Sequence, residues 1–246
     1  MIRSQQCMRS TDMETNILGM AFDLEGTLVD LELAHHLSNL LMARELGFNL
    51  TLEEARERFP SFFGGPERAV AAELQRASGT TMNVDDIISR TRSHFERLKS
   101  NFPIKPRSGA LRFLDEAKAR GFRMAIGSAT SRKQGNILLE VTGLAEYFTD
   151  QCRVFLEDVV EPKPSAAVFN ETAKRLGINP SEQLVFEDSP NGVIAASSAG
   201  SFVIAVPAFS NRMIKDRLET AGALCIFDGW AAISIKGVMQ LLAERR

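Results

Sequence analysis

Short apolar runs that alternate with helical patterns are the feature that most constrains how this chain can fold. Five runs have the length and composition of buried strands: NILGMAFD, GFRMAIGSA, EQLVFEDS, SFVIAVP and GALCIFDG. Helical patterns lie between them, over residues 110–120, 132–142, 166–176 and 193–199. Strands that alternate with helices are typical of a parallel sheet covered by helices on both faces. The sequence therefore predicts an α/β fold.

Polar residues stand at the ends of three of these runs. Asp23 ends the first run, Ser128 the second, and Glu187 and Asp188 the third. Because ligands of parallel α/β sheets bind beyond the carboxyl ends of the strands, this is where chemistry is expected.

The segment from Leu33 to Asn101 breaks the alternation, because it has no strand pattern. Four helices with recognisable ends are expected there instead. The signals are Gly47 closing the first, a Thr51–Glu54 capping box opening the second, Pro66 starting the third and Asn83 capping the fourth. The stretch SNFPIKPRSG, with two prolines and a glycine, is interpreted as the return linker. We therefore expect a flexible tail over residues 1–16, a helical subdomain over 33–102, and a core made of 17–32 and 103–246.

Charge, length and cysteine usage limit the classes of function. The 246 residues are 44% hydrophobic and carry a net charge of −2, which suits a large core and gives no sign of nucleic acid or an anionic membrane as a partner. No apolar run approaches the roughly 20 residues that a membrane helix needs. Cys7, Cys152 and Cys225 are widely spaced, as expected of reduced thiols in a cytoplasmic protein. We expect a cytoplasmic monomer or weak homodimer.

The residues at the strand ends suit attack on phosphorus. A carboxylate such as Asp23 can form an acyl phosphate, and holding a phosphate dianion beside it requires a divalent cation and a lysine. Lys163, in EPKPSAAVF, offers that charge at the start of a helix whose N-terminus also favours anions. Ser128 offers a hydroxyl donor, and Asp188, beside Glu187, offers oxygen ligands for a metal.

Four motifs in order along the chain resemble those of the haloacid dehalogenase superfamily: FDLEGTLVD, AIGSAT, KPSAAVFNETAKRLGI and VFEDSPNGVIAASSAG. The helical insert after the first motif is similar to that of a subgroup of phosphatases and β-phosphoglucomutase-like enzymes with a small α-helical cap. The resemblance runs from about Ile17 to the C-terminal region. It implies a Rossmann-like parallel-sheet core, an inserted α-helical cap, and phosphoryl chemistry that uses Mg²⁺.

The resemblance also implies a role for each matching residue. Asp23 matches the nucleophile. Glu25 matches the general acid and base, whose backbone carbonyl also binds the magnesium ion. The remaining matches are Ser128 and Lys163 as phosphate ligands, Asp188 as a direct metal ligand, Glu187 as a metal ligand acting directly or through water, and Arg68 and His35 of the cap as substrate-binding positions.

Three positions depart from the usual pattern of the family. The family usually has aspartate at the position of Glu25, glycine at that of Pro162 and an acid at that of Ala167. The extra methylene of Glu25 moves its carboxyl group by about 1–1.5 Å, and a misplacement near 1 Å can cost on the order of 100-fold in rate. A rigid site built for aspartate would suffer, whereas a pocket shaped around glutamate would not. Because a carboxyl group is retained, we expect a working site with a longer arm.

The sequence thus predicts a magnesium-dependent phosphatase that hydrolyses a small phosphorylated metabolite through an aspartyl phosphate. Two alternatives stay open. A phosphomutase uses the same residues but returns the phosphoryl group to its substrate. A catalytically weak binding protein would keep the fold while Glu25 marked relaxed selection on turnover. Each residue alone also has an ordinary explanation, such as a helix N-cap for Ser128 and a solvated surface charge for Lys163 or Arg68.

Overall fold

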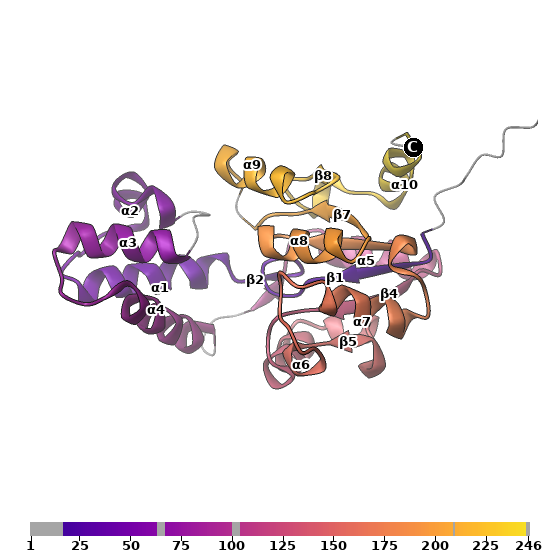
Figure 1. Cartoon of the computed structure of the whole chain (residues 1–246), viewed down its shortest axis with the longest axis horizontal. Coiled ribbons are helices and arrows are strands. Elements are labelled where there is room, and N and C mark those ends of the chain that lie inside the picture. Colours follow the sequence, from indigo (N-terminus) through magenta and orange to yellow (C-terminus); the bar gives the residue numbers. More distant parts are fainter. Residues whose placement is uncertain (1–16, 63–66, 100–103, 209, 245–246) are drawn as a thin grey trace, which may run out of the picture.

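A six-stranded parallel sheet forms the larger of the two bodies seen in Figure 1. The computed structural model describes residues 17–62, 67–99, 104–208 and 210–244, so the expected tail over 1–16 lies outside the described residues. The strand order is β5-β4-β1-β6-β7-β8. The strands are β1 Gly19–Phe22, β4 Arg123–Gly127, β5 Arg153–Val154, β6 Gln183–Glu187, β7 Phe202–Ala205 and β8 Cys225–Ile226.

The predicted α/β fold with a parallel sheet is confirmed, since each of the five predicted runs contains one strand. The sequence does not reveal β5, because a strand of two residues is too short to show a period. This strand pairs with β4, Ile126 opposite Arg153 and Gly127 opposite Val154, and so extends the sheet beside the end of β4.

Each face of the sheet has its own apolar core. Successive side chains of a strand point to opposite faces, so Met20 and Phe22 of β1 enter one core and Ala21 enters the other. Helices cover both faces, as the alternation in the sequence predicts. The first core is covered by α5 (Ala110–Ala119), α6 (Arg132–Val141) and α10 (Ile235–Glu244), and the second by α7 (Ala167–Leu176), α8 (Pro190–Ser198) and α9 (Arg212–Thr220).

Aromatic rings fill the first core beside the central strands. Phe22 and Phe186 stack with their ring centroids 5.1 Å apart and an interplanar angle of 7°. Trp230 lies 5.1 Å from Phe186, and its Nε1 donates a hydrogen bond of 2.8 Å to the carbonyl of Thr27. The core is therefore tied directly to the loop that follows Asp23.

Among the described residues, four α-helices make up most of the smaller body, on the left in Figure 1. The capping box is present, with Glu54 N donating to Thr51 Oγ1 at 3.2 Å and Thr51 N donating to Glu54 Oε2 at 2.8 Å. Asn83 caps the fourth helix by accepting from Asp86 N at 2.8 Å, whereas Pro66 lies outside the described residues. The helices enclose an apolar core of their own. They are α1 Glu32–Glu45, α2 Leu52–Arg58, α3 Glu67–Ser78 and α4 Val84–Lys99.

Two chain segments connect the bodies, and they lie side by side. Strand β2 (Val29–Asp30) leads into the cap, and β3 (Lys105–Pro106) leads back from it within the expected linker. The two strands pair antiparallel, and Arg107 N donates to Leu28 O at 2.8 Å. The base of the cap is therefore held next to the loop that carries Asp23.

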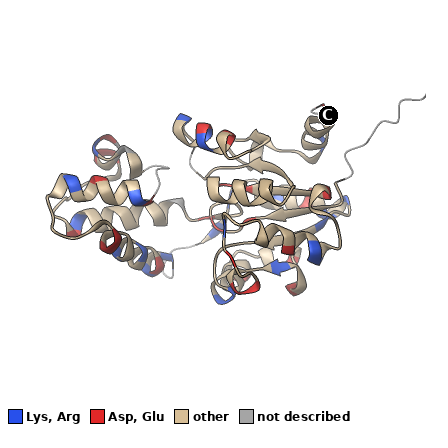
Figure 2. Cartoon of the chain, viewed as in Figure 1, with Lys and Arg blue, Asp and Glu red and all other residues tan. Residues whose placement is uncertain are grey.

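Acidic and basic residues are interspersed over both bodies in Figure 2. Within the part of the chain that the structure describes, no helix has the length and apolarity to cross a membrane.

The close approach of α6 to the sheet generates a first prediction, which concerns Gly135. A Cβ atom at Gly135 would lie only 2.1 Å from Phe155 Cε1 and would therefore overlap the ring of this buried residue. Gly135→Ala should therefore lower the free energy of unfolding by about 1–3 kcal/mol through overpacking, although alanine normally favours a helix by about 1 kcal/mol. Urea unfolding measures this change.

Gly237→Ala in α10 is the matched control. Gly237 is exposed, and the atom nearest to its added Cβ would be the hydroxyl oxygen of the exposed Ser234 at 3.2 Å. This variant should be neutral or slightly stabilised. Equal stabilisation by both substitutions would contradict the packing of α6 on Phe155.

Candidate active site

The candidate site lies where the central strands of the sheet end. Asp23 follows β1, Ser128 follows β4, and Glu187 and Asp188 end and follow β6. Because β1 pairs with both β4 and β6, the three strand ends are neighbours. A pocket of about 630 Å³ opens here, and all of its lining residues but one are polar. The lining is Asp23, Glu25, Glu96, Lys99, Ser128, Ala129, Thr130, Ser131, Gln134, Lys163, Asp188, Ser189 and Asn191.

A buried lysine joins two of the carboxylates. Lys163 Nζ lies 2.7 Å from Asp23 Oδ1 and 2.5 Å from Glu187 Oε1, and the side chains are 6%, 9% and 0% exposed. Burial opposes the charge of the ammonium, but the two carboxylates outweigh it and raise the pKa of Lys163 above its ordinary value. Lys163 is therefore a permanent cation beside Asp23.

The carboxyl groups of Asp23, Glu187 and Asp188 are crowded together, with one oxygen of each within 4.8 Å of the others. Burial, opposed by Lys163 and reinforced by Glu187, raises the pKa of Asp23 from 3.8 to about 7. Burial and the two neighbouring carboxylates also raise the pKa of Asp188 well above its ordinary value. Several hard oxygen donors that repel one another in a buried site fit a divalent cation such as Mg²⁺.

Glu187 differs from the other two acids in its bonding. Its Oε2 accepts from the backbone N–H groups of Asp188 and Ser189, both at 3.0 Å, and from the Ser189 hydroxyl at 3.1 Å. Lys163 bonds its other oxygen. Glu187 thus fixes the turn after β6, while Asp23 and Asp188 offer the oxygens better placed for a metal.

A close approach fixes the loop after Asp23. Gly26 has φ +87°, and a Cβ atom there would lie 2.2 Å from Asp188 Oδ2. Only glycine fits both the left-handed backbone and the missing space. Arg107, which follows β3, also holds this loop. Its guanidinium donates to Gly26 O at 2.7 Å and to the carbonyls of Val206 and Pro207.

Ser128 is buried in the pocket, and it is not the helix N-cap. Its N–H donates to Val154 O at 3.0 Å, and its Oγ accepts from Thr130 N at 3.3 Å. The cap of α6 is Ser131, which accepts from Gln134 N at 3.3 Å. The hydroxyl of Ser128 therefore lines the pocket without serving the end of a helix.

Glu25 lies in the pocket and points its carboxylate at the cap. Its Oε1 is 3.2 Å from Nζ of Lys99, the last residue of α4. Neither Lys99 nor Arg107 is identified by the sequence patterns. Lys99 ends α4 and Arg107 follows β3, and only their long-range contacts distinguish them from other basic residues.

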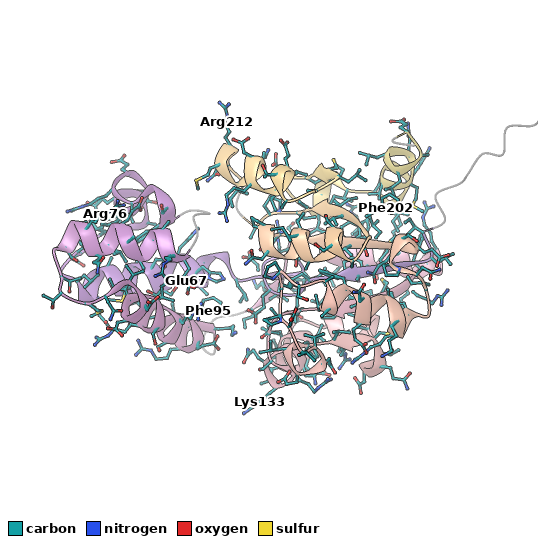
Figure 3. All side chains as sticks on the ribbon, viewed as in Figure 1. Glu67, Arg76, Phe95, Lys133, Phe202 and Arg212 are labelled. Carbon is teal, nitrogen blue, oxygen red and sulfur yellow. The ribbon has the colours of Figure 1, made fainter. Side chains whose placement is uncertain are left out.

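Two of the expected binding residues do not line this pocket. Arg68 is an exposed residue of α3, and its guanidinium pairs with Asp85 at 2.8 Å. His35 lines a second hollow of about 460 Å³, which shares Asp188 with the first, and its ring stacks on Phe95 at 4.1 Å. Phe95, labelled in Figure 3, lies at the end of the cap nearest the core. The substrate-binding roles of Arg68 and His35 stay predictions.

Comparison with known proteins agrees with this geometry. The sequence profile of haloacid dehalogenase-like hydrolases matches residues 20–206, so the chain belongs to this family. The resemblance seen in the motifs, and the prediction of a hydrolase, are thereby confirmed.

Three individual proteins illustrate the relationship. A phosphorylated carbohydrates phosphatase of Thermotoga maritima is 28% identical over 179 residues, covering 73% of this chain and 80% of that protein. A family hydrolase of Deinococcus radiodurans, solved with phosphate and sodium, has a TM-score of 0.71 at 24% identity and covers 93% and 98% of the two chains. CbbY of Rhodobacter sphaeroides, solved with phosphate, has a TM-score of 0.60 at 27% identity and covers 90% and 98%.

The crowded carboxylates generate a prediction for the metal-free protein. Between pH 4 and 7 folded Asp23, with its pKa about 7, keeps a proton that the unfolded chain has lost. Stability therefore falls as the pH rises through this window. Asp23→Asn mimics the neutral acid, so in EDTA it should be more stable than the wild type at pH 8, by up to about 4 kcal/mol, and similar to it at pH 4.

Urea unfolding at a series of pH values measures the difference. Asp216→Asn, which changes an exposed acid of α9, is the control and should follow the wild-type curve. If the difference in free energy of unfolding between Asp23→Asn and the wild type does not increase with pH, the result would count against the burial of this charge.

Proposed function

We propose that this protein is a magnesium-dependent phosphatase that hydrolyses a small, hydroxyl-rich phosphomonoester through an aspartyl phosphate. The observation that carries the proposal is the buried contact of Lys163 with Asp23 and Glu187 at the ends of adjacent strands. It supports Asp23 as the nucleophile, because a cation lies directly beside this carboxylate. The names and bound phosphates of the relatives support the same chemistry.

Asp23 and Asp188, with the backbone carbonyl of Glu25, would hold the metal ion. Glu187 would support them by fixing the turn that carries Asp188. Their crowding and raised pKa values fit such a cation. When bound, the ion supplies positive charge that offsets the carboxylates and attracts the phosphoryl oxygens. Lys163 and the Ser128 hydroxyl donate to the remaining oxygens.

In the first half of the reaction, a carboxylate oxygen of Asp23 attacks phosphorus and the ester P–O bond breaks. Glu25 gives its proton to the leaving alkoxide, so the alcohol departs neutral. In the second half, water attacks the aspartyl phosphate and the P–O bond to Asp23 breaks. Glu25 takes the proton of that water, which restores both side chains and releases inorganic phosphate.

The pocket also supports a class of substrate. Apart from Ala129 its lining is polar, with hydroxyl, amide and charged side chains. Such a surface suits the hydroxyl groups of a phosphorylated carbohydrate better than an apolar leaving group.

Asp23 gives the direct test. Asp23→Asn should fold but lose phosphate release by at least about 10³-fold, because an amide is a poor nucleophile. EDTA should abolish wild-type activity and Mg²⁺ should restore it. A panel of sugar phosphates, scored for inorganic phosphate and for isomer formation, also separates a hydrolase from a phosphomutase.

Two controls accompany this test. Asp216→Asn should keep full activity, because this residue lies on the surface of α9. Mg²⁺ should raise the melting temperature of the wild type more than that of Asp23→Asn. Substantial phosphate release by purified Asp23→Asn would refute the proposal.

Glu25 gives a second prediction. Glu25→Gln should lower kcat/KM for alkyl phosphates by about 10²–10⁴-fold, the usual worth of general acid catalysis. The loss should be much smaller for 4-nitrophenyl phosphate, whose leaving group needs no proton. Glu25→Asp should also lower the rate on alkyl phosphates, because the shorter arm ends about 1–1.5 Å away. A clear gain with Glu25→Asp would show that the longer arm is a defect.

A further inference from the structure

Lys99 is a buried cation that comes from the cap and lines the candidate site. Its side chain is only 3% exposed, and its Nζ lies 3.2 Å from Glu25 Oε1 and 3.1 Å from Glu96 Oε1. The same ammonium lies 5.1 Å from the centroid of the Phe95 ring. A buried ammonium is costly unless it is paired, so these contacts are what make the position tolerable.

We propose that Lys99 is a positioning residue for Glu25, fixing the carboxylate of the longer arm inside the pocket. The inference rests on the proposed function, because it assigns Lys99 a part in the proton transfer that Glu25 performs. Lys99 acts through Glu25 and is given no contact with the reacting atoms.

The lengths of the two side chains fit each other. Glutamate has one more rotatable bond than aspartate, so its carboxyl group needs an anchor to stay in one place. An aspartate on the same backbone would end about 1–1.5 Å short of the present contact with Lys99. The departure from the usual family residue at position 25 therefore has a partner across the cap boundary.

The contact also links the position of the cap to the proton relay. Phe95, one turn before Lys99 on α4, stacks on His35 of α1 at 4.1 Å, so the two ends of the cap meet beside Lys99. Glu96 lies on the same helix and would keep Lys99 paired if Glu25 moved. Glu25 is therefore anchored only while the end of α4 lies against the core.

Leaving-group dependence tests the inference. We compare kcat/KM for the best alkyl phosphate of a sugar-phosphate panel with that for 4-nitrophenyl phosphate, since kcat/KM reports the steps up to formation of the aspartyl phosphate. Lys99→Met should lower kcat/KM for the alkyl phosphate by about 10–100-fold, the scale of a misplaced catalytic group. The aryl phosphate should lose about 3-fold or less.

Two further variants isolate the pair. Lys99→Arg keeps the charge and should retain most of the activity on alkyl phosphates. In a Glu25→Gln background, Lys99→Met should cost no more than about 3-fold, because residues that act as a unit are not additive. Arg90→Met, which removes an exposed cation from the same helix and its surface pair with Glu45, is the control and should change neither substrate.

Three results would overturn the inference: no change in Lys99→Met, a full additional loss in the Glu25→Gln background, or an equal loss on both substrates. An equal loss with a raised KM would mean that Lys99 binds the phosphoryl group, and an equal loss with a lower melting temperature would mean a structural role. If Lys99→Met does not fold, Lys99→Gln carries the same comparison. Wild-type activity that survives Asp23→Asn would instead refute the proposed function itself, whatever Lys99 does.

Discussion

The contact of Lys163 with Asp23 and Glu187 is the interaction on which the rest of the site depends. A lysine that is 6% exposed must be paired, and Asp23 and Glu187 supply its partners from the ends of neighbouring strands. Glu187 also fixes the turn after β6, because its second oxygen accepts from the first N–H groups that follow this strand. Helix α8 then comes so close that a Cβ atom at Gly192 would lie 1.8 Å from Glu187 Oε1.

The same cluster is left with more negative charge than one lysine can neutralise. Asp23, Glu187 and Asp188 share a space in which their oxygens lie within 4.8 Å of one another. Burial, together with this repulsion, raises the pKa values of Asp23 and Asp188. A site of this kind is costly to the fold, and under the proposed function a bound cation and phosphoryl group would offset that cost. The repulsion therefore lies at the residues that the proposed function assigns to catalysis and metal binding.

The two bodies of the protein contribute different things to this site. The sheet supplies rigid positions, because Asp23, Ser128 and Asp188 follow strands whose register is fixed by the ladder. The cap supplies Lys99 of α4, whereas Phe95 and His35 line the neighbouring second hollow. Glu25 lies between the two, on the core loop but in contact with the cap. Exchange of aspartate for glutamate at this position is therefore best understood from both bodies together.

The sequence by itself determined the parallel α/β fold and which residues meet at the ends of its central strands. The strand runs ending in Asp23, Ser128 and Glu187 suffice, because the carboxyl ends of neighbouring parallel strands must meet at one edge of a sheet. The capping box at Thr51 could likewise be predicted from the sequence, because its two partners are only three residues apart.

Only the tertiary structure decided the rest. The contact of Lys99 with Glu25 spans 74 positions and that of Arg107 with Gly26 spans 81, so no local pattern announces either. The location of Arg68 outside the pocket, and the two-residue strand β5, depend in the same way on how distant segments pack. Periodicity and capping patterns report interactions between residues that are close in the sequence. Contacts between distant residues depend on burial and charge, and these are defined only in the folded chain.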